Sequence, residues 1–240
     1  MTDVKTRLVV YDLDGTLVDS AGHIANVVNK TRRHYGLSPL SVDEVRPCIG
    51  DGAQTLVEKS LFGLAGAPPP SFGVLSRAAH PLPGVFSTFM DIYSADTSSG
   101  IGVVDGVMET LERLGKLGIA QAVLTNKPHA AALEVIEAMG LSPFIFMTIG
   151  PGARVPGVSG PMPAKPDPTG LRHLMLLAGA SPEETIMVGD GIQDVRVAAA
   201  AGARCIAIAS EDFLVPMFVA TGLSRSRVVG SFADAAALID

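Results

Sequence analysis

The sequence contains few cysteines and lacks a long uninterrupted apolar run. Its two cysteines, Cys48 and Cys205, lie far apart without Cys-x-x-Cys spacing, which excludes a disulfide framework and a cysteine-based zinc site and favours a reducing compartment. The longest apolar run, 197–209, is rich in alanine and is interrupted by Arg204, so it is too short and too polar to span a bilayer. Because Met1–Lys5 show no apolar segment typical of a signal peptide, we expect a cytoplasmic protein that does not bind a membrane.

Basic residues are also scarce. Lys and Arg number 18 against 24 Asp and Glu, which gives a formal net charge of -6. This balance does not supply the basic stripe of a nucleic-acid-binding protein, so we expect no nucleic-acid partner. An acidic protein that handles an anion must concentrate positive charge locally, with a metal ion or a few Lys and Arg side chains. The 240 residues suffice for one large domain, or for one domain that carries a smaller inserted one.

Strand-like apolar runs alternate with helical patterns over most of the chain. The runs expected to be strands are 8–11, 119–124, 144–149, 185–188 and 205–208. The helical patterns that separate or follow them are 107–117, 133–139, 168–178, 195–201 and 232–239, whereas 150–163 is predicted to be a loop and 213–220 is ambiguous. This alternation, with crossovers long enough for right-handed βαβ units, predicts an α/β fold with a doubly wound, mostly parallel sheet covered by helices on both faces.

A helical stretch interrupts the alternation after the first strand. Residues 19–96 contain helical patterns and loops without a convincing strand, and Ser41–Glu44 has the Ser-x-x-Glu form of a capping box. Within this stretch, Pro68–Pro70 breaks the helical pattern. We therefore predict a discontinuous core of residues 1–18 and 97–240, with residues 19–96 forming a small inserted helical domain.

The first apolar run ends in two carboxylates, Asp12 and Asp14, followed by the turn residues Gly15 and Thr16. Ligands of open parallel sheets bind outside the carboxyl ends of the strands, so both carboxylates would lie at the mouth of a site. Residues i and i+2 of an ideal strand face the same side, so both could turn towards one Mg²⁺ ion, which would offset their repulsion. The alternative is an ordinary surface turn, since Asp and Gly are common turn residues.

Polar residues also follow three later strands. They are Thr125 and Asn126, then Lys165, then Asp190 and Asp194. Phosphoryl transfer uses this set of groups: one carboxylate attacks phosphorus, a second moves a proton, hydroxyl, amide and ammonium groups hold the phosphoryl oxygens, and further carboxylates bind Mg²⁺. Each group alone could be a helix cap or a solvated surface residue. Their occurrence in this order at successive strand ends favours a phosphoryl-transfer site.

Four segments resemble the four motifs of the haloacid dehalogenase superfamily: Asp12–Thr16, Thr125–Pro128, Lys165–Pro168 and Gly189–Asp194. The helical insert lies between the first and second segments, as does the small helical cap of that superfamily. The segments Asp12–Ser20 and Ile49–Leu56 are similar to those of its phosphoglycolate phosphatases. The resemblance implies a Rossmann-like core with a helical cap domain. It also implies a Mg²⁺-dependent phosphomonoester hydrolase that forms an aspartyl-phosphate and acts on a small metabolite such as 2-phosphoglycolate.

The resemblance assigns roles to the residues of the first motif. Asp12 would be the nucleophile and a Mg²⁺ ligand. Asp14 would be the general acid and base, and would bind the metal through its backbone carbonyl. Gly15 and Thr16 would support the site.

The later motifs receive roles in the same way. Thr125 and Lys165 would bind the phosphoryl group, with Asn126 beside them. Asp190 would bind Mg²⁺. Asp194 would hold either the waters of the metal or the lysine.

The insert would determine which ester is hydrolysed. Its loop Gly50, Asp51 and Gly52 would close over the substrate, and glycines there allow the backbone to approach closely. Arg46 is a candidate ligand for a substrate carboxylate, with a solvated surface arginine as the alternative. His23 could face the site or be structural.

Three other functions stay open. A phosphosugar mutase would use the same core but would keep the phospho-enzyme long enough to return the phosphoryl group. A dehalogenase would not need the acid supplied by Asp14. A phospho-accepting signalling module would be phosphorylated at Asp12 with slow turnover, but it would not need the helical insert. As partners we expect a small phosphate ester and, at most, a second copy of the chain, so that the protein is a monomer or a homodimer.

Overall fold

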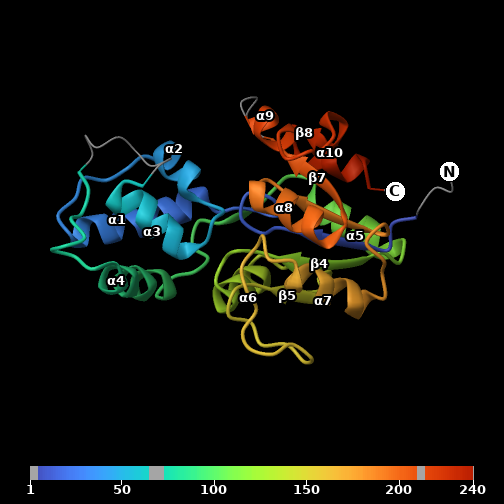
Figure 1. The fold of residues 1–240 in the computed structure, drawn as a ribbon, viewed down its shortest axis with the longest axis horizontal. Coiled ribbons are helices and arrows are strands. Elements are labelled where there is room, and N and C mark those ends of the chain that lie inside the picture. Colours follow the sequence, from blue (N-terminus) through green and yellow to red (C-terminus); the bar gives the residue numbers. More distant parts are fainter. Residues whose placement is uncertain (1–4, 65–72, 210–213, 240) are drawn as a thin grey trace. The chain divides into compact units, whose positions relative to one another are not determined.

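The computed structural model describes residues 5–64, 73–209 and 214–239 (Figure 1). The predicted break at Pro68–Pro70 and the first four residues of the chain lie outside these ranges. The chain divides into two compact units, one comprising Met1–Val18 and Val103–Asp240 and the other Asp19–Gly102. The second unit extends past the predicted end of the insert at residue 96, and the roles of the two units as core and cap stay a prediction.

The larger unit contains a six-stranded sheet in the order β5-β4-β1-β6-β7-β8, and each of its described pairings is parallel. Its strands are β1 Leu8–Tyr11, β4 Ala120–Leu124, β5 Met147–Ile149, β6 Thr185–Gly189, β7 Arg204–Ile208 and β8 Val228–Val229. Every side chain of β1 is fully buried, as expected of a central strand covered on both faces. These features confirm the predicted doubly wound α/β fold.

Helices cover both faces of this sheet. They are α5 Val107–Lys116, α6 His129–Ala138, α7 Thr169–Ala178, α8 Ile192–Ala201, α9 Leu214–Val219 and α10 Phe232–Ala237. Side chains alternate between the faces along β1, so Leu8 and Val10 join a core cluster with residues of α7 and α8. On the opposite face, the ring of Tyr11 lies 6.1 Å from that of Phe232 in α10.

Several local predictions differ from the structure. The strand predicted over 144–149 begins only at Met147, because the backbone N–H of Phe144 donates to the carbonyl of Leu141 and turns the chain. Strand β8 was not predicted. The ambiguous run 213–220 contains α9, with Phe213 outside the described residues. The segment 150–163 is a loop as predicted, and Met162 N–H donates to Ala153 O at 2.7 Å across its base.

The smaller unit is helical. Its helices are α1 Ala21–His34, α2 Val42–Val45, η1 Arg46–Cys48, α3 Ala53–Phe62 and α4 Leu82–Ser94, and the chain reaches it through β2 Val18–Asp19 and leaves it through β3 Gly102–Val103. The capping box is present: Ser41 Oγ accepts from Glu44 N–H and the Glu44 carboxylate accepts from Ser41 N–H. The buried guanidinium of Arg32 donates to the carbonyls of Ser38 and Ser60, which ties two parts of this unit together.

Both cysteines are free and buried, so they form no disulfide. Burial raises the pKa of the Cys205 thiol, which makes it a poor nucleophile. Within the described parts of the chain, no helix combines the length and apolar character needed to cross a membrane.

Candidate active site

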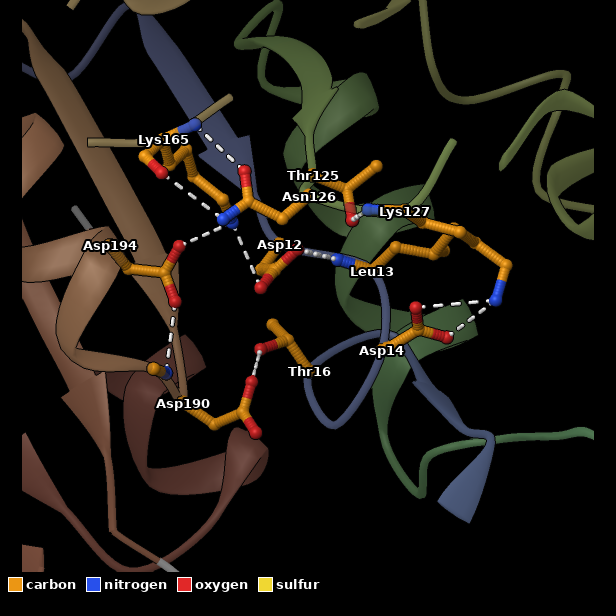
Figure 2. A network of polar contacts seen from close by, with 11 residues as sticks. Asp12, Leu13, Asp14, Thr16, Thr125, Asn126, Lys127, Lys165, Asp190 and Asp194 are labelled. Atoms are coloured by element: carbon orange, nitrogen blue, oxygen red, sulfur yellow. Dashed lines mark hydrogen bonds and ion pairs between the residues drawn. The ribbon is translucent and has the colours of Figure 1, made fainter. Parts of the chain in front are cut away.

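The candidate site lies where the central strands of the larger unit end. Because β4, β1 and β6 are adjacent and parallel, their carboxyl ends meet at one edge of the sheet. Asp12 follows β1, Thr125 follows β4 and Asp190 follows β6, while Lys165 comes from the loop before α7 and Asp194 from the first turn of α8. Figure 2 shows these predicted residues gathered around Asp12.

Lys165 lies between two carboxylates. Its Nζ is 2.9 Å from Asp12 Oδ2 and 2.6 Å from Asp194 Oδ1, and all three side chains are at least nine-tenths buried. Burial alone would lower the pKa of Lys165, but the charges of Asp12 and Asp194 and the hydrogen bonds to them raise it. The lysine is therefore charged and partly neutralises the carboxylates beside it.

Asp12, Asp190 and Asp194 form an acidic cluster. Each contributes a carboxylate oxygen, and these oxygens lie within 4.8 Å of one another. Burial and the neighbouring carboxylates Asp12 and Asp194 raise the pKa of Asp190 to about 8. Burial also raises the pKa of Asp194, to about 6, although the charge of Lys165 opposes this. The three carboxylates carry more negative charge than the single lysine can neutralise. Carboxylate oxygens are also the ligands that a hard divalent cation prefers, so the cluster fits such a cation.

The Asp14 carboxylate faces away from this cluster. Its Oδ1 and Oδ2 lie 3.0 and 3.2 Å from Nζ of Lys127. The structure therefore does not bring the Asp14 side chain into the acidic cluster, and the binding of one ion by both first-motif carboxylates stays a prediction. The alternation that suggested it holds within a strand, but β1 ends at Tyr11 and Asp14 lies beyond it, in a bridge to Val18. Metal binding by the backbone carbonyl of Asp14 stays a prediction.

The loop after β1 holds the carboxylates in place. Leu13 N–H donates to Asp12 Oδ1 at 2.7 Å, and Thr16 Oγ1 donates to Asp190 Oδ1 at 2.9 Å. Gly15 has φ +83°, and a Cβ there would overlap the Asp190 carboxylate. Both its backbone conformation and its surroundings therefore require glycine at this position.

Asn126 fixes the main chain of Lys165. Its Oδ1 accepts from Lys165 N–H at 2.7 Å, and its Nδ2 donates to the carbonyl of Lys165 at 3.2 Å. Thr125 Oγ1 accepts from Lys127 N–H at 3.2 Å. Neither side chain caps α6, for which Pro128 is the N-cap, so the capping alternative is not the one adopted. Direct contact of Thr125 and Asn126 with a phosphoryl group stays a prediction.

Asp194 has two structural contacts. Besides binding Lys165, it accepts a hydrogen bond from Gly191 N–H at 2.9 Å through Oδ2. It is almost completely buried, which rules out the solvated surface alternative. Gly191 is the N-cap of α8, so this contact bears out the helix-cap alternative for Asp194. Contact with the lysine is observed as well, and contact with the waters of a metal stays a prediction.

Lys127 is the residue that sequence reasoning missed. Lys127 belongs to the Thr125–Pro128 motif, and this membership is the feature of the sequence that could have pointed to it. The motif alone assigns it no role. Its side chain is 2% exposed and forms an ion pair with Asp14. Burial of a lysine and the direction of its side chain are set by the fold, so the motif alone could not reveal this pairing.

The remaining candidates lie in the smaller unit. Gly50 and Gly52 both have positive φ, and Asp51 Oδ2 lies 2.8 Å from Nζ of Lys59. Arg46 is exposed in η1, and His23 is buried with its Nδ1 2.9 Å from the carbonyl of Ser99. A role in a substrate site stays a prediction for the loop Gly50, Asp51 and Gly52 and for Arg46. The contact of His23 with Ser99 fits the structural alternative for this histidine.

Comparison with curated proteins relates the chain to phosphatases. The chain is 35% identical to phosphoglycolate phosphatase 1 of Pseudomonas aeruginosa over 202 aligned residues. The aligned region covers 84% of this chain and 69% of the Pseudomonas chain. This chain is also 32% identical over 203 residues to the phosphoglycolate phosphatase of Chromobacterium violaceum, with 84% of each chain covered.

Solved structures share the fold. A predicted phosphoglycolate phosphatase from Haemophilus somnus superposes with a TM-score of 0.76 at 23% identity over 98% of both chains. CbbY from Rhodobacter sphaeroides, in complex with phosphate, superposes with a TM-score of 0.67 at 20% identity over 95% of both chains. The family model described as haloacid dehalogenase-like hydrolase matches residues 9–208. The chain therefore belongs to the haloacid dehalogenase-like hydrolase family, within which it is a phosphatase of the phosphoglycolate phosphatase-like group.

Proposed function

We propose that this protein is a Mg²⁺-dependent phosphomonoester hydrolase that forms an aspartyl-phosphate on Asp12 and acts on 2-phosphoglycolate. The observation that carries the proposal is the position of Asp12, which belongs to the acidic cluster and whose Oδ2 lies 2.9 Å from the buried ammonium of Lys165. A carboxylate held beside a buried cation can accept a phosphoryl group whose oxygens that cation stabilises. The names of the curated relatives support the choice of substrate.

In the first half of the reaction, Asp12 is phosphorylated. An oxygen of Asp12 forms a bond with phosphorus as the bond between phosphorus and the ester oxygen breaks. Asp14 gives its proton to the leaving oxygen, which departs as an alcohol. Lys165 and Thr125 hold the phosphoryl oxygens and stabilise the charge that develops on them.

In the second half, water attacks the phosphorus of the aspartyl-phosphate. Asp14 accepts a proton from this water as the bond between phosphorus and Asp12 breaks, which releases inorganic phosphate and restores both carboxyl groups. A Mg²⁺ ion bound by Asp12, Asp190 and the backbone carbonyl of Asp14 would supply positive charge next to the phosphoryl oxygens. Asp194 would keep Lys165 in place through both steps.

The test is phosphate release from a panel of small esters by the native chain and by Asp12→Asn. The panel includes 2-phosphoglycolate and a sugar bisphosphate, each with Mg²⁺ and with EDTA. We expect Mg²⁺-dependent release that is highest for 2-phosphoglycolate and falls by about 10⁴-fold in the variant. Asp91→Asn, the same change at an exposed aspartate, serves as the matched control and should retain native activity.

Each other result has a defined meaning. Preference for a different ester would keep the reaction and discard the substrate. Formation of an isomer in place of phosphate would indicate a mutase. A long-lived phospho-enzyme with little turnover would indicate a signalling module. Release by Asp12→Asn at the native rate would show that Asp12 is not the nucleophile.

A further inference from the structure

Lys127 is a buried cation of the site to which the reaction above gives no role. Its side chain is 2% exposed, and its Nζ lies 3.0 Å from Asp14 Oδ1 and 3.2 Å from Asp14 Oδ2. Figure 2 shows Lys127 reaching Asp14 on the opposite side of Asp12 from Lys165. The site therefore contains two separate cations, one beside the proposed nucleophile and one beside the proposed proton-transfer residue.

The ion pair with Lys127 and the proposed reaction make competing demands on Asp14. In this structure both carboxylate oxygens of Asp14 contact Lys127, whereas the reaction requires one of them to face the ester oxygen. When Asp14 turns to that oxygen, at least one of its contacts with Lys127 lengthens. Weakening the contact of a buried ammonium with an anion is costly unless another anion approaches it.

A carboxylate on the substrate is placed to be that anion. In 2-phosphoglycolate the carboxylate is attached to the carbon that bears the ester oxygen, so its oxygens lie about 3 Å from the ester oxygen. Asp14 spans the gap between the ester oxygen and Lys127 during proton transfer, and the substrate carboxylate therefore comes within reach of Nζ. A lysine ammonium has three donors on a flexible stem, so it can bind this carboxylate while it keeps one contact with Asp14.

We propose that Lys127 binds the carboxylate of the substrate and that Asp14 occupies this position in the free enzyme. The inference rests on the proposed function and deepens it by naming the residue that recognises the carboxylate on the ester-bearing carbon of the substrate. When that carboxylate binds, Lys127 moves away from one oxygen of Asp14. This Asp14 oxygen is then free to face the ester oxygen. Recognition of the substrate and proton transfer are thus coupled through one lysine.

Two esters that differ only in the carboxylate test this inference. They are 2-phosphoglycolate and 2-hydroxyethyl phosphate, in which a hydroxymethyl group replaces the carboxylate. For Lys127→Met we expect kcat/KM to fall about 100-fold with 2-phosphoglycolate and less than about 10-fold with 2-hydroxyethyl phosphate. Lys127→Arg, which keeps the charge, should recover part of the difference. Lys116→Met changes an exposed lysine of α5 and should leave both values native.

Binding measured without turnover provides a second readout. In the Asp12→Asn background, calorimetry should show that Lys127→Met weakens binding of 2-phosphoglycolate about 10-fold more than binding of 2-hydroxyethyl phosphate. Circular dichroism checks that each variant is folded, and Lys127→Gln replaces Lys127→Met if the latter is not.

The results separate this inference from the proposed function. Equal losses with both esters, or no discrimination between them by the native enzyme, would overturn the role of Lys127 and leave the phosphatase reaction standing. Native activity of Asp12→Asn would overturn the reaction itself.

Discussion

The two edges of the parallel sheet hold their charged residues in opposite ways. At the carboxyl edge, Lys165 is 4% exposed and bridges two buried carboxylates. At the amino edge, Arg7 and Glu184 approach to 3.8 Å with side chains that are 55% and 30% exposed. Water screens the exposed pair, so that pair adds little stability, whereas the buried charges depend on their protein partners. Of these charged residues, the costly buried ones lie at the carboxyl edge, where chemistry can use them.

Lys165→Met should produce the largest effect. The substitution removes the cation between Asp12 and Asp194 and leaves two buried carboxylates together. We expect kcat/KM to fall about 10³-fold and the free energy of unfolding in metal-free buffer to fall by about 3 kcal/mol. Steady-state kinetics and urea unfolding measure the two quantities. A variant as stable as the native chain would show that these carboxylates do not depend on the lysine.

Asp190→Asn tests the acidic cluster next. Removing one of three clustered carboxylates should raise the Mg²⁺ concentration needed for half-maximal thermal stabilisation by about 100-fold. A thermal-shift titration with Mg²⁺ measures this midpoint, and Asp91→Asn should titrate like the native chain. An unchanged midpoint in Asp190→Asn would place the cation elsewhere.

Asn126→Ala should have an intermediate effect. The change leaves the backbone N–H and carbonyl of Lys165 without the carboxamide that now binds both. We expect a loss of about 2 kcal/mol in the free energy of unfolding and about a tenfold lower kcat/KM, because Lys165 is less firmly placed. If activity stays native while stability falls, Asn126 supports the fold without positioning the lysine.

Arg7→Ala, at the amino edge, should have the smallest effect. We expect the free energy of unfolding to change by less than about 1 kcal/mol and kcat/KM to stay within about twofold of the native value. Both are measured alongside Lys165→Met. Comparable destabilisation by the two substitutions would remove the contrast between the edges.

The core strands were predictable because strong local patterns mark them. β1, β4, β6 and β7 are apolar runs that end near glycine or polar residues, and their alternation with helical patterns gives the parallel sheet. Strand β8 has two residues, which is too short for any periodicity to appear. Residues 144–146 are as apolar as a strand, yet the backbone turns there, and apolar character alone does not distinguish the two conformations.

The site was predictable in its residues and less so in their contacts. The positions of Asp12, Lys165 and Asp194 follow from strand ends and motifs, and the structure brings these side chains together. The direction of Asp14 and the burial of Lys127 depend on the loops beyond the strands, where no periodicity applies. The Asn126 carboxamide binds the main chain of a distant residue, a contact that sequence patterns do not encode.

The pairing of β1 also has a consequence for biosynthesis. β1 is hydrogen-bonded between β4 and β6, which comprise residues 120–124 and 185–189. During synthesis this apolar strand therefore leaves the ribosome long before β4 and β6 have been translated. A strand without its partners is prone to aggregate. We expect nascent chains that stop before residue 189 to need chaperones and to lack activity, since Asp12, the proposed nucleophile, acquires its neighbours Asp190 and Asp194 only after β6 has been made.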